Sequence, residues 1–303
     1  MIVGKTVLAV TGFAPVRSLF TATRPGRALS TRFVAGESLD DATAVARSLN
    51  ERNARVSLDH LGEHVTDRDQ AVAACGDYLA CLDRIGAEKL DANISIKLTQ
   101  LGMGFDDELA ETSLRTLASR AAELDTSVTV DMEESRYTET TISIYERVQR
   151  DMGNVGLAVQ AYLKRTRDDL DRLIPLGGHI RLCKGAYAEP DDIAYQSRDE
   201  VDRSFDRLAH ILMSSGTVRP AMASHDDDRL AVVAGLASTR TEYFEYQMLY
   251  GVRPDLQREM LSQGRTLRVY VPYGEAWYPY LTRRLAERPA NLWFFARAVV
   301  GSR

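Results

Sequence analysis

The sequence predicts an α/β protein folded as one (βα)8 barrel, and three observations support this prediction. Eight short runs rich in β-branched and other apolar residues recur along the 303-residue chain, at intervals of about 22 to 45 residues. No hairpin-type turn joins neighbouring runs, and each is followed by a longer stretch with helical periodicity, which is the crossover that parallel strands need. The length is normal for one barrel, typically about 250 residues.

The eight runs are the expected strands, at 55–58, 92–98, 127–132, 155–161, 179–183, 220–223, 243–248 and 266–271. The helix expected after the first strand begins at a capping box of Thr66 and Asp69 and stops near Gly86. Its apolar stripe is Val72, Cys75, Leu79, Leu82 and Ile85. The next helix carries Ala110, Leu114, Leu117, Ala121 and Leu124. An open doubly wound sheet is the alternative, but no glycine-rich dinucleotide fingerprint follows the first strand.

One domain, residues 1–303, is the economical interpretation, because no Pro/Gly/Ser-rich linker or compositional break divides the chain. Residues 1–36 are expected to be a helical extension before the barrel. They contain no Asp or Glu and carry Arg17, Arg24, Arg27 and Arg32, so a transit peptide or weak signal sequence is the alternative.

Composition excludes several classes of function. A formal net charge of −5 argues against nucleic-acid binding, which needs a basic surface. Cys75, Cys81 and Cys183 show no CxxC spacing and are interpreted as free thiols in a reducing, cytoplasmic compartment. No segment reaches the roughly 18 to 20 uninterrupted apolar residues of a membrane span.

Polar residues end all eight expected strands, which predicts a functional mouth, because active sites of such barrels lie at the carboxyl ends of the strands. In chain order they are Asp59 and Glu63, Lys97, Asp131 and Glu133, Gln160 and Tyr162, Arg181 and Lys184, Ser224 and His225, Glu245 and Gln247, and Tyr270 and Tyr273.

Two further patterns narrow the chemistry. Lys184-Gly185-Ala186-Tyr187 follows a strand, and its small residues would let a flat ring or a phosphate approach the backbone; a plain turn is the alternative. Near the end of the chain, Tyr280, Arg283, Arg284 and Glu287 lie on or beside one helical face. Two arginines with a tyrosine suit the capture of a small carboxylate, although a solvated basic face has the same pattern.

No metal site is predicted. The five histidines form no HxH or HxxxH pair on a credible strand or helix. His60 and His64 are four residues apart at a strand exit, but the sequence offers them no obvious third ligand.

Ten strings in the chain resemble the proline dehydrogenase family, including the dehydrogenase domain of proline utilisation A. They are FVAGES, LDHLGE, SIKLTQLG, VDMEE, VQAYL, RLCKGAY, SHD, EYQMLYG, RVYVPYG and YLTRRLAE, in family order from about Phe33 to Glu287. The resemblance implies a distorted TIM-type (βα)8 barrel whose last helix lies over the mouth. It also implies an FAD-dependent oxidoreductase that converts L-proline to Δ1-pyrroline-5-carboxylate, the first step of proline catabolism to glutamate.

The resemblance assigns roles to individual residues. Asp131 and Arg181 resemble the catalytic pair, with Arg181 facing N5 of the flavin. The residues that resemble the substrate site are Lys97, Arg283 and Arg284 as the carboxylate clamp, and Tyr270 and Tyr280 as walls for the ring. Those that resemble the FAD lining are Met132, Gln160, Arg181, Lys184, Gly185, Ala186, Tyr187, Ser224 and His225.

Three departures from the family pattern bear on the flavin site. Asp226 stands where relatives often carry Asn, and its negative charge would sit awkwardly near phosphates. Ala188 replaces a Trp that commonly follows KGAY. Cys183 replaces a typical Val and is expected to be a small buried residue.

The resemblance further implies re-oxidation by a quinone or another electron acceptor, with transient contact at the inner face of the membrane. The second step to glutamate is expected from a separate pyrroline-5-carboxylate dehydrogenase. Two rival functions stay open. A Schiff-base aldolase could use Lys97 or Lys184, since a desolvated lysine attacks carbonyls, and a non-catalytic barrel would bind a small acid without electron transfer.

Overall fold

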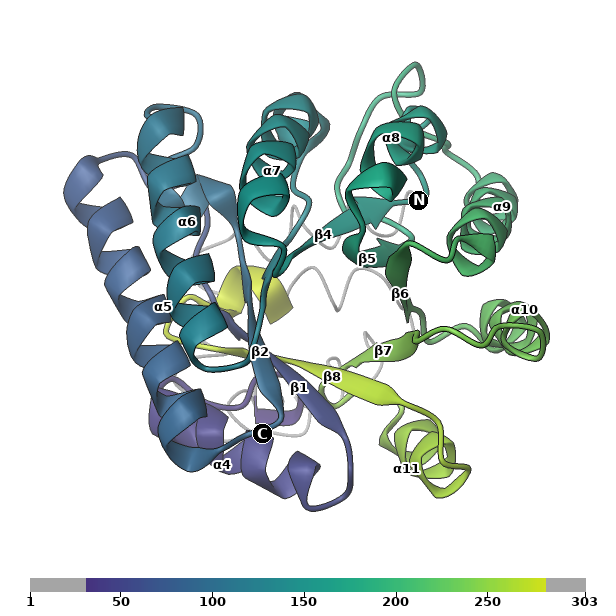
Figure 1. The fold of residues 1–303 in the computed structure, drawn as a ribbon, viewed down its shortest axis with the longest axis horizontal. Coiled ribbons are helices and arrows are strands. Elements are labelled where there is room, and N and C mark those ends of the chain that lie inside the picture. Colours follow the sequence, from purple (N-terminus) through teal and green to yellow (C-terminus); the bar gives the residue numbers. More distant parts are fainter. Residues whose placement is uncertain (1–30, 282–303) are drawn as a thin grey trace, which may run out of the picture.

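The computed structural model describes residues 31–281, in which eight parallel strands close into a barrel (Figure 1). The strands are β1 (Arg55–His60), β2 (Ala92–Ile96), β3 (Val128–Val130), β4 (Val155–Gln160), β5 (Gly178–Cys183), β6 (Val218–Ala223), β7 (Glu245–Leu249) and β8 (Leu267–Tyr273). Each strand pairs with its sequence neighbours, and β8 closes the barrel on β1. The expected barrel is confirmed, since every expected strand overlaps one of these.

Helices cover the outside of the barrel (Figure 1). They are α4 (Leu39–Asn50), α5 (Arg68–Glu88), α6 (Asp107–Glu123), α7 (Thr138–Met152), α8 (Thr166–Leu173), α9 (Arg198–Ser214), α10 (Asp227–Ala237) and α11 (Pro254–Ser262), with 3-10 turns at Leu98–Leu101, Ser135–Tyr137 and Ile174–Leu176. Helix α6 buries Ala110, Leu114, Leu117 and Ala121, as its sequence stripe predicts.

Helix α5 differs from its prediction at both ends and at one residue of its apolar stripe. The N-cap is Asp67, not Thr66, and its side chain accepts a hydrogen bond from the backbone N–H of Gln70. The helix continues through Gly86 and ends at Lys89, which takes a left-handed conformation with φ 52°. Its buried residues are Ala71, Ala74, Tyr78, Cys81, Leu82 and Ile85, whereas Val72 is exposed. Leu82 and Ile85 of the predicted stripe are buried as expected, and Cys75 and Leu79 are partly buried against the core. Val72 alone lies outside the buried face.

The axis of the barrel is polar, because side chains along each strand alternate between the two faces of the sheet. Leu58, Ile94 and Val130 belong to the main core, which the sheet shares with the helices. The alternate positions carry hydrogen-bonding groups, and the Asn93 side chain bridges neighbouring strands. Its Oδ1 accepts from Ser57 Oγ at 2.5 Å. Buried polar groups therefore pair with one another across the interior.

Helix α4 occupies the place that the helix after the last strand has in a regular barrel. It precedes β1 and packs against β1 and β8. Asp40 and Arg47 of α4 pair with Arg84 and Glu88 of α5. The chain after β8 is thereby kept out of the outer ring, and residues 277–281 form a helical turn that lies inside the ring in Figure 1.

A short N-terminal segment holds this turn in place. A separate apolar cluster consists of Phe33, Val34, Leu61, Trp277, Tyr280 and Leu281. The indole N–H of Trp277 donates to Glu37 Oε1 at 3.0 Å. The FVAGES string is therefore the support of the turn after β8. Most of the expected extension at 1–36 and the continuation of the last helix beyond residue 281 lie outside the described residues.

Candidate active site

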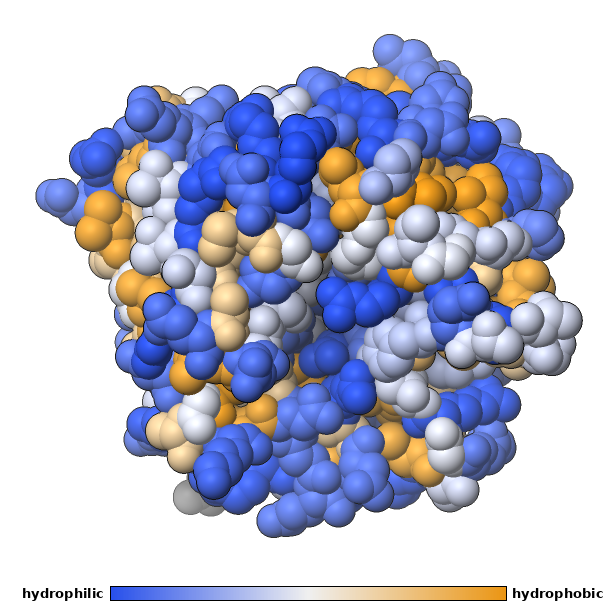
Figure 2. Space-filling model, in the orientation of Figure 1, coloured by the Kyte–Doolittle hydropathy of each residue, from blue (hydrophilic) through white to orange (hydrophobic). Residues whose placement is uncertain are grey.

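A pocket of about 670 Å³ opens at the carboxyl ends of the strands. Figure 2 shows this face hollowed near its middle, with hydrophilic residues around the hollow. Every strand, or the loop after it, contributes to the lining. The lining includes Asp59, Lys97, Asp131, Met132, Ala158, Gln160, Arg181, Cys183, Lys184, Gly185, Ala186, Tyr187, Arg198, Ala223, Ser224, His225, Asp226, Gln247, Met248, Leu249, Tyr270 and Tyr280.

Lys97 holds two carboxylates together in this pocket. Its ammonium lies 3.0 Å from Asp59 Oδ1 and 3.5 Å from Asp131 Oδ2. Burial alone would lower the pKa of Lys97, but the two carboxylates outweigh burial and raise that pKa above its usual range. Lys97 is therefore a fixed cation.

The two carboxylates have different electrostatic surroundings. Burial raises the pKa of Asp59 despite the attraction of Lys97. Burial opposes the charged form of Asp131 as well, but Arg181 and Lys97 outweigh it and lower the pKa of Asp131. Asp131 Oδ1 also accepts from Ser95 Oγ at 2.7 Å. Asp131 is therefore the carboxylate that stays charged.

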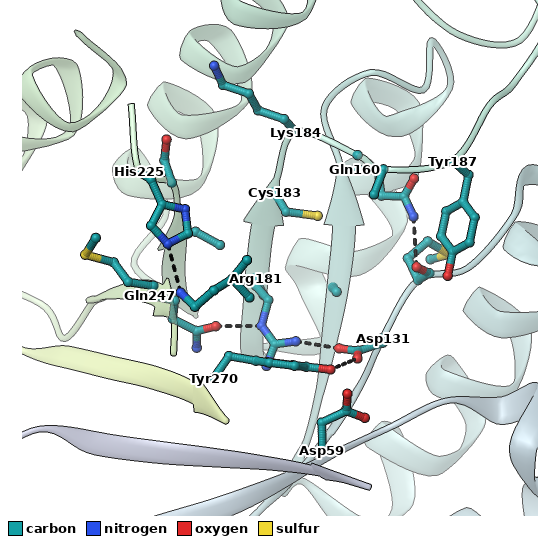
Figure 3. A pocket seen from close by; sticks show the side chains of 18 of the residues that line it. Asp59, Asp131, Gln160, Arg181, Cys183, Lys184, Tyr187, His225, Gln247 and Tyr270 are labelled. Carbon is teal, nitrogen blue, oxygen red and sulfur yellow. Dashed lines mark hydrogen bonds and ion pairs between the residues drawn. The ribbon is translucent and has the colours of Figure 1, made fainter. Parts of the chain in front are cut away.

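Arg181 and Gln160 each leave one buried polar atom without a partner. The guanidinium of Arg181 donates through Nε to Gln247 and through Nη1 to Asp131, whereas its buried Nη2 meets no hydrogen-bond acceptor among residues 31–281 (Figure 3). Gln160 Nε2 donates to the Met132 carbonyl at 2.8 Å, and its buried Oε1 has no donor within the described chain. An unmade hydrogen bond on a buried group costs free energy, so these two atoms mark where a polar ligand would bind.

Tyr270 forms a wall beside these groups. Its hydroxyl donates to Asp131 Oδ2 at 2.6 Å, and the Arg181 guanidinium lies 5.2 Å from the ring centroid. Burial and the nearby carboxylate of Asp131 raise the pKa of Tyr270 well above 10, so the hydroxyl stays a donor. The ring is thus fixed through both its face and its hydroxyl.

A second charged cluster lies after β5 and β6. Lys184 Nζ pairs with Asp202 and, at 2.8 Å, with Asp226. Arg198 Nη2 lies 3.0 Å from Asp226 Oδ2. Burial favours the neutral form of Asp226, but hydrogen bonds from Lys184 and Arg198 lower its pKa far below the usual range. This end of the pocket holds two cations that carboxylates of the chain neutralise.

The sequence of most of the chain matches a known family: residues 42–297 fit the profile described as Proline dehydrogenase. The chain belongs to the proline dehydrogenase family. Proline dehydrogenase 1 of Bacillus subtilis (strain 168) is 36% identical over 272 residues, which cover 89% of this chain and 90% of the relative. Proline dehydrogenase of Deinococcus radiodurans is 33% identical over 283 residues, 90% of each chain.

Solved structures agree with the fold of the family. The crystal structure of proline utilization A from Bdellovibrio bacteriovorus, inactivated by N-propargylglycine, matches 86% of this chain with a TM-score of 0.81 at 24% identity. A mutant of proline utilization A from Bradyrhizobium japonicum matches 92% with a TM-score of 0.76 at 27% identity. This chain spans only 33% and 32% of those two chains.

The residues that the family pattern assigns to the flavin come together in the pocket, with Met132, Gln160, Arg181, Lys184, Gly185, Ala186, Tyr187, Ser224 and His225 all in its lining. His225 Nε2 accepts from the Leu249 backbone N–H at 2.9 Å, which fixes the ring. Of the residues assigned to the substrate, Lys97, Tyr270 and Tyr280 line the pocket. Arg283, Arg284 and Glu287 lie outside the described residues.

The departures from the family pattern have three different outcomes. Asp226 lines the pocket within the second charged cluster. Ala188 is exposed and is absent from the lining. The expectation that Cys183 is fully buried is wrong, because this residue is half-buried and lines the pocket, with its thiol 3.4 Å from the Val159 carbonyl oxygen.

Two polar residues expected at the mouth turn away from it. Glu133 follows β3, but its carboxylate accepts from the Thr99 backbone N–H at 3.1 Å and from Thr99 Oγ1. Burial raises the pKa of Glu133 to about 7. Glu245 is the first residue of β7 rather than one near its end, so it lies on the floor of the barrel. The expected strand began two residues early, at Tyr243, but its end lay only one residue from the observed end. Glu245 was therefore too far from the end of the strand to reach the mouth.

Three aromatic or acidic residues expected at the mouth are also absent from the pocket lining. Tyr273 stacks on His60 with ring centroids 5.1 Å apart, and Glu63 lies outside the pocket. Tyr162 packs against Gly185, where a Cβ atom would come within 2.2 Å of the tyrosine ring. Gly185 also has φ +112°, so the fold itself requires glycine there, whatever the pocket holds.

Sequence reasoning missed five lining residues: Ala158, Arg198, Ala223, Met248 and Leu249. Ala158 lies two residues before Gln160 on β4, so strand alternation could have placed it in the interior. Arg198 is the first residue of α9, and no strand end or motif marks it. It reaches the pocket because the loop after β5 brings the start of α9 to the mouth.

The structure brings one group of three potential metal ligands together among the described residues: His64, Glu133 and Glu134. The sequence offered His64 no obvious third ligand, whereas the structure places Glu133 and Glu134 beside it and stacks His60 on Tyr273. His64 Nε2 lies 3.1 Å from Glu134 Oε1, and Thr99 engages Glu133. Glu134 Oε2 is buried and has no hydrogen-bond partner among residues 31–281.

A search of the described helices finds none that is both long and apolar enough to cross a membrane.

Proposed function

We propose that this protein is a flavin-dependent L-proline dehydrogenase, which oxidises L-proline to Δ1-pyrroline-5-carboxylate with FAD as the electron acceptor. Membership of the family supports the reaction. The observation that carries the proposal is the buried centre of Lys97, Asp131 and Arg181, next to Arg181 Nη2 and Gln160 Oε1, which have no hydrogen-bond partner within the described part of the chain. Such a centre suits a zwitterionic amino acid beside a flat polar ring.

The residues present fit a flavin. Arg181 Nη2 is a donor for a ring nitrogen, and Gln160 Oε1 is an acceptor for a ring N–H. Lys184 and Arg198, at another part of the same pocket, suit the pyrophosphate of FAD. Met132, Gly185, Ala186, Tyr187, Ser224 and His225 would complete the lining around the cofactor.

When bound, FAD would take a hydride equivalent from C5 of proline. The chain's own residues would mainly position the substrate and stabilise the charge that develops during the reaction. Lys97, Arg283 and Arg284 would hold the proline carboxylate by charge-assisted bonds, and Tyr270 and Tyr280 would confine the ring.

The buried charges would also act on the reaction. Arg181 would supply a fixed positive charge that stabilises the negative charge developing beside it. Asp131 would orient both Lys97 and Arg181, since it pairs with each of them. Neither cation would then need to reorganise during the reaction.

The aldolase rival loses its support, because neither lysine is a free amine in an apolar site. Lys97 lies between two carboxylates that raise its pKa, and Lys184 pairs with Asp226. A Schiff-base lysine needs a lowered pKa or an adjacent cation.

We further propose that a quinone or another acceptor re-oxidises the protein during transient contact with the inner face of the membrane. The product would pass to a separate pyrroline-5-carboxylate dehydrogenase. Activity of the purified chain with a short-chain quinone would test the acceptor, and no loss of activity after removal of membranes would contradict an obligate membrane contact.

The visible spectrum of the purified full-length protein tests the reaction. FAD-loaded protein should be yellow, and anaerobic L-proline should bleach the flavin band without added nicotinamide. An unchanged spectrum in FAD-loaded protein would refute the activity. Proline binding without bleaching would favour the non-catalytic barrel, and a colourless adduct trapped by borohydride would favour the aldolase.

A further inference from the structure

Glu245 lies on the floor of the barrel as a buried anion. Its Oε1 lies 2.7 Å from Arg268 Nε and 2.6 Å from Gln247 Nε2, and its Oε2 accepts from the Tyr243 hydroxyl at 2.5 Å. Burial would raise the pKa of Glu245, but Arg268 and His179 outweigh burial and hold that pKa well below its usual range. An ionised carboxylate accepts hydrogen bonds and never donates them.

Gln247 lies two residues further along β7 and therefore faces the same interior. Glu245 only accepts and Arg181 only donates, so together they determine which way the Gln247 amide faces. The amide NH2 turns toward Glu245, so its carbonyl oxygen turns toward Arg181 and accepts from Arg181 Nε at 2.6 Å. A reversed amide would bring N–H against N–H at Arg181 and lose both bonds.

Arg181 is consequently held on two sides. Gln247 holds Nε, while Asp131 and Ser95 hold Nη1. Figure 3 shows Gln247 and Asp131 on opposite sides of the guanidinium. Because the guanidinium is planar, these two attachments also fix the direction of Nη2, the atom that has no acceptor among residues 31–281.

We propose that Gln247 is a positioning residue for Arg181, and that Glu245 acts on Arg181 through Gln247 by anchoring its amide with a charge-assisted hydrogen bond. Neither side chain needs to touch the substrate. The catalytic consequence rests on the proposed function, whereas the hold on Arg181 is a property of the chain alone. The hold on Arg181 and its effect on catalysis can therefore be tested separately.

The substitution that tests the hold is Gln247→Met, which keeps the length of the side chain and removes both hydrogen bonds. Its matched control is Gln149→Met. Gln149 is another buried glutamine, whose Oε1 accepts from the Val155 backbone N–H at 2.9 Å, and it is absent from the pocket lining.

The first measurement needs no cofactor and no substrate. In nitrogen-15 spectra of the full-length, flavin-free chain, the Arg181 Nε–H signal can be assigned by its absence in Arg181→Lys. We expect slow exchange with water in the unmodified protein and in Gln149→Met, and fast exchange in Gln247→Met. An Arg181 signal that Gln247→Met leaves unchanged overturns the proposal, even if the protein turns out not to oxidise proline.

The second measurement uses FAD-loaded protein. A loosely held guanidinium stabilises the reduced, anionic ring less well, so Gln247→Met should lower the flavin midpoint potential. Its kcat should fall about ten- to hundredfold, as expected for one lost charge-assisted bond, with a smaller change in KM. Gln149→Met should change neither quantity. Equal potentials in the unmodified protein and Gln247→Met would refute the positioning role.

Glu245→Gln tests the indirect part of the proposal. Arg181 still requires the carbonyl oxygen of Gln247, but the hydrogen bond that anchors the Gln247 amide NH2 loses its charge assistance and becomes weaker. We expect a shift of the midpoint potential in the same direction as in Gln247→Met, but smaller. A potential equal to that of the unmodified protein would remove Glu245 from the proposal. If this variant fails to fold because Arg268 loses its counter-ion, Glu245→Asp replaces it, because the shorter carboxylate keeps the charge beside Arg268 and reaches less far toward Gln247. It should also lower the potential, and an unchanged potential would again exclude Glu245.

Discussion

Replacement of Lys97 by methionine should destabilise the fold more than almost any other single change in the pocket. Lys97 is the cation within 3.0 Å of Asp59 and 3.5 Å of Asp131, and the two carboxylates have side-chain exposures of only 1% and 13%. Removal of one partner from a buried ion pair costs about 3 to 5 kcal/mol, because the remaining charge cannot regain water. For a domain of this size, that loss corresponds to a fall in Tm of about 6 to 20 °C.

The loss of stability in Lys97→Met should depend on pH, and the sign of this dependence follows from the pKa of Asp59. The folded pKa of Asp59 already lies above its unfolded value, and removal of Lys97 raises it further. A carboxyl with a raised folded pKa destabilises the fold when ionised and ceases to do so once protonated. The difference in Tm between Lys97→Met and the unmodified protein should therefore be largest near pH 8 and smaller near pH 5.

Calorimetry of the flavin-free, full-length chain at both pH values measures this difference. Lys164→Met is the control, because Lys164 is exposed and its loss should change stability by no more than about 0.5 kcal/mol. A fall in Tm no larger than that of the control, or a difference that widens toward pH 5, would show that the lysine does not hold the two carboxylates as described.

Four further substitutions test the site. Asp226→Asn should tighten FAD binding by about three- to tenfold, because it releases the two cations that Asp226 pairs with; equilibrium dialysis measures this, and weaker binding would exclude these cations from the phosphate site. Tyr270→Ser should reduce the preference for L-proline over 4-hydroxy-L-proline by about tenfold in kcat/KM, since a smaller residue admits the hydroxyl. If the unmodified enzyme already used both substrates equally, Tyr270 would have no part in specificity. Arg283→Ala and Arg284→Ala should each weaken proline binding about ten- to hundredfold and leave FAD binding unchanged, and an unaltered affinity in both would favour a solvated basic face.

The order of strands and most of the pocket could be predicted because they depend on local patterns. Strand alternation and the carboxyl-end rule are enough to place Lys97, Asp131 and Arg181 at one mouth. Neither rule determines in which direction a side chain turns when its residue lies just beyond the end of the strand. Glu133 has the same kind of position as Asp131, yet it turns outward because Thr99, from another part of the chain, offers two hydrogen bonds.

The failures also have physical causes. Glu245 was assigned to the mouth although it lies three residues before the end of the expected strand, because alternation fixes the face on which a side chain lies and not its depth. On α5, the predicted stripe was wrong at Val72, and the sequence does not reveal that Tyr78 reaches the Gln100 side chain at 2.9 Å. Arg198 depends on the path of a loop, for which periodicity carries no information.

The turn at 277–281 has a consequence for the order in which the protein assembles. Its tether, the hydrogen bond from Trp277 to Glu37, joins residues 240 positions apart. Closing so long a loop is entropically costly, and contacts of this kind tend to form after local ones. We expect the wall that carries Tyr280 to be the last part of the pocket to form during folding. A large cofactor could then bind while the pocket is still open on the side of residues 277–281. Once these residues have packed, they would slow dissociation of the cofactor.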